Sequence, residues 1–292
     1  MTTTPALLAP VGASRRLKPF RRTAMPGLGL TLGMTMLWLG LLVLLPIVAV
    51  IVRSLGLGPA HFAAVAFSAR ALAAYRLSFG AALVAAAING VFGLLIAWVL
   101  VRYQFPGKRL IGALVDLPFA LPTAVAGIAL TAIYADNGFV GRPLAMLGIK
   151  IAYTPAGVVM ALVFIGLPFV VRTVEPVLAD LGKDIEEAAA TLGATRLAVF
   201  GRVLLPEIAP ALMTGFALAF ARGVGEYGSV IFIAGNMPFH SEIAPLLIVT
   251  QLEQFDYEGA TAIAAVMLAL SFALLVVINL IQARERRWRD NR

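Results

Sequence analysis

Six apolar stretches, each long enough to cross a lipid bilayer, dominate this 292-residue chain. An α-helix rises 1.5 Å per residue, so about twenty apolar residues span the hydrocarbon layer. An unpaired backbone group costs several kcal/mol in lipid, so each stretch must be helical. We therefore predict an all-α, polytopic membrane protein with six transmembrane helices, placed near Leu28–Val52, Leu77–Val101, Leu110–Tyr134, Thr154–Val171, Ile208–Ala234 and Ala260–Ile281.

The composition supports lipid as the solvent of most of the chain. Apolar residues make up 61% of it and charged residues only 13%, whereas soluble domains carry about 25% charged residues. Such a chain has too many apolar side chains for one aqueous core. We divide it into a basic tail at residues 1–25, one membrane domain at 26–283 and a second basic tail at 284–292.

Lys and Arg are concentrated in alternate loops, which predicts the orientation. Seventeen lie in the two tails and in the loops after the second and fourth spans, against five in the other loops. Under the positive-inside rule, both termini and a loop at about 172–207 face the cytoplasm. No aromatic interleaving accompanies the basic tails, so we expect no nucleic-acid partner. The last outer loop is acidic, and solvation of its carboxylates is the favoured interpretation.

Several functional classes lack the residues that they require. The chain has no cysteine, which excludes disulfides and thiolate chemistry. His61 and His240 fall in separate predicted loops without a second ligand, so no metal site is expected. A Gly-x-x-x-x-Gly-Lys-Ser/Thr phosphate loop is missing, so this chain should not hydrolyse ATP. We predict no cofactor and no catalytic residue on the chain.

Two spans are interrupted. Pro118 and Pro122 lie within the third, and proline removes a helical hydrogen bond. Arg222 lies near the middle of the fifth, four residues before Glu226, in a glycine-rich sequence. Broken helices and intramembrane charges often mark transport pathways, but a packing kink and a structural ion pair are equally open. The candidate pathway residues are Pro122, Thr123, Arg222, Gly225, Glu226 and Tyr227.

The loop at 172–207 carries helix signals. Asp184 is expected to cap a short helix over Ile185–Leu192, with Glu187 completing a capping box. Gly193 suits the left-handed residue that ends such a helix, and Thr195 is expected to cap a second one. Beyond this loop, two stripes of small residues in the fifth span are predicted to pack against a second subunit, namely Gly215, Ala219 and Gly223, and Ala217, Ala221 and Gly225.

The loop resembles the signature loop of ABC importer permeases. Glu187, Ala188, Ala189 and Gly193, followed by Val203, Leu205 and Pro206, match the family's spacing. The resemblance implies a type I ABC importer permease fold with a core of five helices preceded by one peripheral helix. It also implies that these seven residues form a coupling helix and its flank, which dock in a cytoplasmic ATPase that binds ATP and Mg²⁺.

A wider likeness points to one branch of the family. The sequence 222–236, the sequence 246–260, the third-span sequence 117–127 and the sequence 26–33 resemble the T-type (CysT) permeases of sulfate/thiosulfate importers. That resemblance implies a bacterial inner-membrane protein that works by alternating access. Its implied partners are a paralogous permease subunit, two ATPase subunits and a periplasmic sulfate-binding protein. A molybdate or tungstate permease, and less closely an ion-coupled secondary transporter, are the alternatives.

Overall fold

The computed structural model describes residues 28–290, with side chains through Leu280 and at Gln282. This part of the chain is helical and contains no strand. Five helical segments are long and apolar enough to cross a membrane, and a bent pair of shorter helices supplies a sixth. The predicted all-α, six-span architecture is therefore confirmed. The basic tail at 1–25 lies outside the described residues. The sequence beginning at Pro26 lies at their edge, since the description starts at Leu28. The side chains of the tail at 284–292 are not described.

The chain divides into two compact units, residues 1–49 and 50–292. The first span is a continuous 29-residue helical segment, Leu28–Gly56, with a mean hydropathy of 2.7. It consists of α1 (Leu28–Leu39), the π-helical segment η1 (Gly40–Leu44) and α2 (Leu45–Gly56). That the first span is peripheral to the others stays a prediction.

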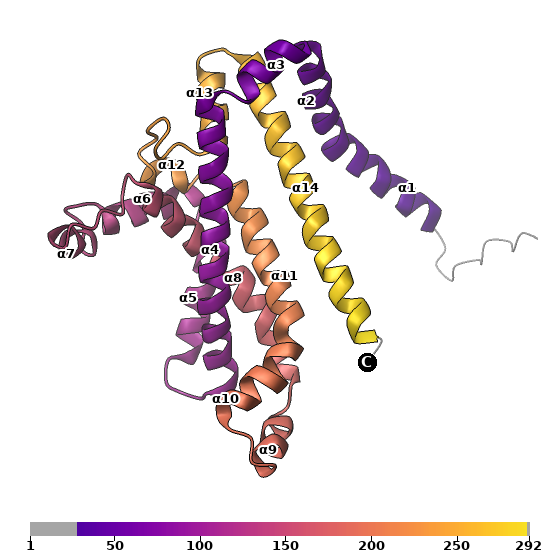
Figure 1. Ribbon diagram of the computed structural model, residues 1–292, viewed down its shortest axis with the longest axis vertical. Coiled ribbons are helices and arrows are strands. Elements are labelled where there is room, and N and C mark those ends of the chain that lie inside the picture. The colour runs from indigo at the N-terminus through magenta and orange to yellow at the C-terminus, as the bar shows by residue number, and fades with distance from the viewer. Residues whose placement is uncertain (1–27, 291–292) are drawn as a thin grey trace, which may run out of the picture. The chain divides into compact units, whose positions relative to one another are not determined.

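Three long helices form the core of the second unit: α4 (Ala69–Arg102), α8 (Pro155–Asp180) and α11 (Leu205–Val224) (Figure 1). Small residues let them approach closely. A side chain at Gly93 of α4 would strike Val170 of α8, and one at Gly223 of α11 would press on Ala82 of α4. Lipid is as apolar as leucine, so such close contact, and not the expulsion of water, holds membrane helices together.

One predicted small stripe is buried in this core. Gly215, Ala219 and Gly223 face α8 and α4 of the same chain, because a side chain at Gly215 would meet Thr173. The prediction that this stripe packs on a second subunit is therefore wrong. The other stripe differs, since Ala221 and Gly225 are exposed.

The third and fifth spans are broken, and their breaks meet. The third consists of α5 (Lys108–Ala120) and α6 (Thr123–Tyr134), which bend by 116° at Pro122, as the two prolines suggested. The fifth is not one rod to Ala234, because α11 ends at Val224 and the chain forms a loop before the four-residue α12 (Val230–Ile233). Gly127 of α6 lies so close to the backbone of Ser229 that no side chain would fit there.

The end of the unit that lies opposite the loop at 172–207 is made of short helices (Figure 1). These are α3 (Pro59–Ala66) and α13 (Ala244–Glu253), with the last span, α14 (Tyr257–Asp290), beginning beside α13. A further short helix, α7 (Gly141–Met146), lies out to the side beyond α6 (Figure 1). His61 lies in α3 and not in a loop, with its Nε2 3.5 Å from the Glu258 carboxylate. Glu242 is buried and paired with Arg70, so for this residue the solvation interpretation of the acidic loop is wrong.

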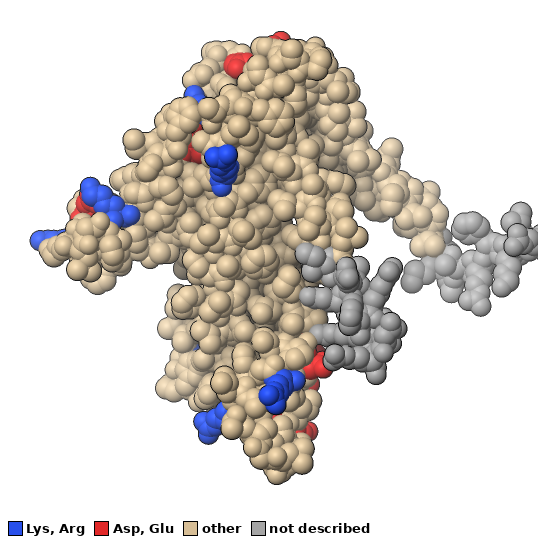
Figure 2. Space-filling view, viewed as in Figure 1, with Lys and Arg blue, Asp and Glu red and all other residues tan. Residues whose placement is uncertain are grey.

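The surface charges follow the division into ends and middle. On the face shown in Figure 2, charged side chains gather toward the two ends of the second unit and on α7, and the broad band between them carries almost none. Exposed Leu, Val, Ile and Phe side chains populate α4, α6, α11 and α14. An uncharged apolar band of this kind is what a bilayer solvates.

Candidate functional site

The first candidate site is the loop at 172–207, whose first nine residues extend α8 to Asp180. Its short helix α9 spans Lys183–Thr191, and Gly182 is the N-cap, without a side-chain hydrogen bond. The predicted capping box is therefore wrong. Asp184 lies inside the first turn, because the helix begins earlier than the sequence indicated, and its charge there still favours the helix dipole.

The end of α9 follows the prediction. Gly193 adopts φ +82°, a left-handed backbone conformation that is unfavourable for residues other than glycine. Gly193 N–H donates to the Ala190 carbonyl at 2.9 Å, and Ala194 N–H donates to the Ala189 carbonyl at 3.1 Å. These two bonds form the Schellman arrangement that terminates a helix. The Thr195 hydroxyl then accepts a hydrogen bond from Ala198 N–H at 3.3 Å, so the predicted cap of α10 (Arg196–Val199) is confirmed.

Arg102, the last residue of α4, fixes α9 in place. Its Nη2 lies 2.7 Å from the Glu186 carboxylate and donates to the Leu181 carbonyl at 2.9 Å. The Arg102 guanidinium also lies 5.6 Å from the centre of the Trp98 ring, a cation–π geometry. The Arg102 side chain is 8% exposed and that of Glu186 is 26% exposed, so the ion pair is partly shielded from water and is screened less than a surface pair.

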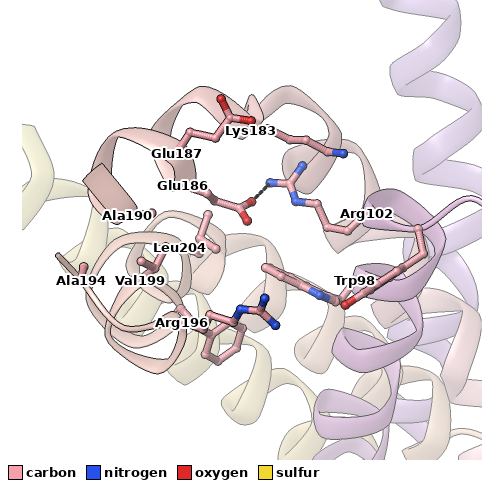
Figure 3. A pocket seen from close by; sticks show the side chains of 12 residues that line it. Trp98, Arg102, Lys183, Glu186, Glu187, Ala190, Ala194, Arg196, Val199 and Leu204 are labelled. Carbon is pink, nitrogen blue, oxygen red and sulfur yellow. Dashed lines mark ion pairs between the residues drawn. The ribbon is translucent and has the colours of Figure 1, made fainter. Parts of the chain in front are cut away.

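Two adjacent glutamates of α9 have opposite orientations. Glu186 points to Arg102, whereas Glu187 points away from it, as Figure 3 shows. Ala188 is exposed, Ala189 is half-buried, and Leu192 is 88% exposed. The exposed face of α9 therefore offers a slim, acidic and apolar surface. The family motif begins at Glu187, and nothing in the motif indicated that the adjacent Glu186 is the residue that pairs with Arg102.

A cavity of about 470 Å³ lies between α9 and the end of α4. It is lined by Trp98, Arg102, Tyr103, Lys183, Glu186, Glu187, Ala190, Ala194, Arg196, Val199, Phe200 and Leu204 (Figure 3). The other motif residues come next along the chain. Val203 belongs to the π-helical segment η2 (Phe200–Leu204), and Leu205 and Pro206 begin α11. The segment thus runs directly into the core helix α11.

The second candidate site surrounds Glu226, just beyond the end of α11. Arg222 Nη1 lies 2.6 Å from the Glu226 carboxylate, so the predicted pair forms although α11 ends at Val224. Ser229 donates to the same carboxylate from its backbone N–H at 3.0 Å and from its hydroxyl at 3.1 Å. The Glu226 side chain is 1% exposed and that of Arg222 is 38% exposed. The glutamate is therefore fully held, and the arginine retains a free face.

The break in the third span contacts the loop that holds Glu226. A side chain at Gly228 would strike the Thr123 hydroxyl, so Thr123 and Gly228 lie in direct contact. Tyr227 is half-buried beside them, and Gly225 is exposed. The structure thus brings Thr123, which follows Pro122, against the Gly-Ser sequence that holds Glu226.

A third cluster was missed by the sequence interpretation, which assigned Arg172 to a loop. Arg172 lies within α8, and its Nε donates to Asp116 of α5 at 2.7 Å. Its other nitrogens bind Asp116 again, Glu175, and the Gly112 carbonyl at 3.0 Å. Asp116 was the available signal, because a carboxylate two residues before Pro118 in an apolar span needs a partner. These hydrogen bonds join α5 to α8.

A family model described as "Binding-protein-dependent transport system inner membrane component" matches residues 89–289. A "Probable sulfate transport system permease protein cysT" of Nephroselmis olivacea is 51% identical over 87% of this chain and 90% of its own length. The chain belongs to the CysT family of binding-protein-dependent transport permeases. The "Sulfate transport system permease protein CysT" of Salmonella typhimurium is 50% identical over 90% of this chain and 95% of its own.

Solved structures agree on the fold. A bacterial ABC transporter that imports the acidic polysaccharide alginate matches with a TM-score of 0.71 at 14% identity, over 88% of this chain and 95% of that one. The same transport system in complex with its alginate-bound periplasmic protein gives 0.73 at 16% identity, over 88% and 94%. The predicted fold of an ABC importer permease is therefore confirmed, and the chain is a multi-pass membrane component of a transport system.

Proposed function

We propose that this chain is a membrane-spanning subunit of an ATP-driven importer for sulfate or thiosulfate. The observation that carries the substrate is the identity of about 50%, over nearly the whole length of both chains, to permeases named for sulfate transport. The two interrupted spans that meet beside Glu226 support a pathway there.

In this proposal α9 is the coupling helix. Its exposed face, with Glu187, Ala188 and Leu192, enters a cleft of a cytoplasmic ATPase. Glu186 is unavailable to that partner, because Arg102 holds it. The sequence lacks a phosphate-loop motif, so in this proposal two ATPase subunits bind ATP and Mg²⁺. The termini and α9 then face the cytoplasm of a bacterium, in agreement with the distribution of Lys and Arg.

Arg222 is the proposed contact for the oxyanion. Ser229 donates both of its hydrogen bonds to Oε1 of Glu226, whereas Arg222 pairs with Oε2, so Oε1 keeps its two donors when the guanidinium turns to a substrate. Arg172 is less suited to this part, because its nitrogens already bind two carboxylates, Asp116 and Glu175, and the Gly112 carbonyl. Thr123 and Tyr227 line the same junction. A periplasmic sulfate-binding protein supplies the selectivity, and this junction passes the anion during alternating access.

A paralogous permease subunit completes the pathway in this proposal. Thr214, Leu218, Ala221 and Gly225 form an exposed stripe along α11 that is small over its last turns. Small residues allow a second helix to approach closely. Ala221 of this stripe directly precedes Arg222. A partner helix packed on the stripe would therefore close the side of the pathway that this chain leaves open.

The test is uptake of radiolabelled sulfate in cells whose own sulfate permeases have been deleted, with this chain and its neighbouring transport genes supplied. ATP-dependent accumulation that excess thiosulfate reduces and molybdate does not is the expected result. Competition by molybdate or tungstate alone would assign the protein to the molybdate branch. Uptake that persists without any ATPase subunit would instead indicate an ion-coupled secondary transporter.

A further inference from the structure

The helix α4 joins the α9 segment to the opposite end of the second unit. It is a single 34-residue helix, Ala69–Arg102, about 50 Å long at 1.5 Å per residue. It contains no proline, whereas α8 contains Pro168 and Pro176 and α11 contains Pro210. A helix without proline retains every interior hydrogen bond and resists bending.

At the α9 end, α4 is attached at two places. Arg102 binds Glu186 of α9 and the Leu181 carbonyl before it. One turn earlier, Trp98 packs edge-on against Phe200 of η2, with ring centres 5.7 Å apart. Both sides of the α9–η2 segment are thus attached to the last two turns of α4, so a displacement of α9 must pull on these turns or break the contacts.

At the other end, α4 is attached in the same way to the loop 235–243. Arg70 in its first turn binds Glu242 with two parallel hydrogen bonds, Nε to Oε2 at 2.8 Å and Nη2 to Oε1 at 2.7 Å. Ser78 Oγ accepts from the Ala244 N–H at 2.8 Å. The Glu242 side chain is 1% exposed. Bidentate arginine–carboxylate pairs fix orientation as well as distance.

We infer that α4 is a strut that carries the movement of α9 to the loop 235–243, and that Arg102 and Arg70 are the positioning residues at its two ends. The inference rests on the proposed function, in which a nucleotide-driven subunit moves α9. In that setting the strut couples ATP binding to the face that receives the binding protein. Packed side chains, hydrogen-bond networks and rigid helices can carry coupling between distant sites.

The test follows movement at each end in the reconstituted complex. Because the chain has no cysteine, one can be placed at Leu192 or at Met237, which are 88% and 55% exposed, and labelled with an environment-sensitive dye. The other subunits are made free of cysteine. A non-hydrolysable ATP analogue is then added to the wild-type chain and to the Arg102→Gln and Arg70→Gln variants. Arg76→Gln is the control, since Arg76 lies exposed on the same helix.

We expect the analogue to change both signals in the wild type and in Arg76→Gln. In Arg102→Gln and in Arg70→Gln the Leu192 signal persists, while most of the Met237 signal is lost. The exchange variant Arg102→Glu with Glu186→Arg should recover much of the Met237 response, which a change that only misfolds the chain does not allow.

An unchanged Met237 response in both variants would overturn the strut. Loss of both signals in Arg102→Gln would also overturn it, because Arg102 would then serve only to dock the ATPase. A wild-type Met237 label that never responds is a third contradicting result. These signals report movement and not substrate, so a complex that carries an anion other than sulfate contradicts only the substrate assignment.

Discussion

Ser229 holds the Glu226 carboxylate from two donors, while Arg222 pairs with the same carboxylate at 2.6 Å. Both Ser229 donors bind Oε1 of the buried acid, and Arg222 pairs with Oε2. Arg222 is therefore the structural partner of Oε2, and a role in the pathway, which the sequence left open, is tested by a variant that still offers Oε2 a donor.

The amide of Arg222→Gln can still donate to Oε2 of Glu226, so this variant should preserve folding and reduce uptake by at least about tenfold, equivalent to ~1.4 kcal/mol of lost interaction with the anion. Arg222→Lys, which keeps the positive charge, should retain more uptake than the glutamine variant. Membrane content and thermal unfolding in detergent provide the folding control. Full uptake by Arg222→Gln would remove this residue from the pathway.

The contact between the two broken spans predicts that Gly228→Val is destabilising. A side chain there strikes Thr123, and overpacking of this kind costs about 1–3 kcal/mol. The unfolding temperature in detergent should fall, and uptake should fall with it. Gly80→Ala on α4 is the matched control, because the space around Gly80 is open. If Gly228→Val were as stable as this control, the spans would not meet as described.

Asp116→Asn should weaken the junction of α5 and α8 more than Glu175→Gln. Asp116 binds two nitrogens of Arg172, and Glu175 binds one. With side chains one third to one half exposed, we expect a loss of about 1–2 kcal/mol for Asp116→Asn. Thermal unfolding of the two variants in parallel is the measurement, and the reverse ranking would contradict the assignment.

Gly193→Asp should abolish transport and leave the protein in the membrane. Its φ of +82° is disfavoured for a side chain, so the Schellman turn and the exposed end of α9 would be distorted. Gly201→Asp is the control, because Gly201 lies in helical backbone with open space around it. Membrane content by immunoblot and uptake are measured together, and normal uptake by Gly193→Asp would count heavily against a coupling role for α9.

The sequence predicted those features that depend on local chemistry. Hydropathy located the spans, Pro122 located the bend, and Gly193 and Thr195 marked one helix end and the next helix start. It failed where a partner comes from a distant segment. Nothing near Glu186 indicated Arg102, which lies 84 residues earlier in the chain, and nothing near Glu242 indicated Arg70. The small stripe at Gly215 was predicted to pack against a second subunit and instead packs within the chain, because small residues suit close contact in both settings.

The most direct test of the account is a crosslink from α9 to an ATP-binding protein. Single cysteines at Ile185, Ala188 and Leu192, which are exposed, are joined to a short bifunctional reagent in membranes that support uptake. A cysteine at Phe139, 93% exposed near α7, is the control for the opposite side. We predict that the α9 positions capture a nucleotide-binding subunit and that Phe139 does not. Failure of every α9 position to capture one, while uptake persists, would contradict the importer account.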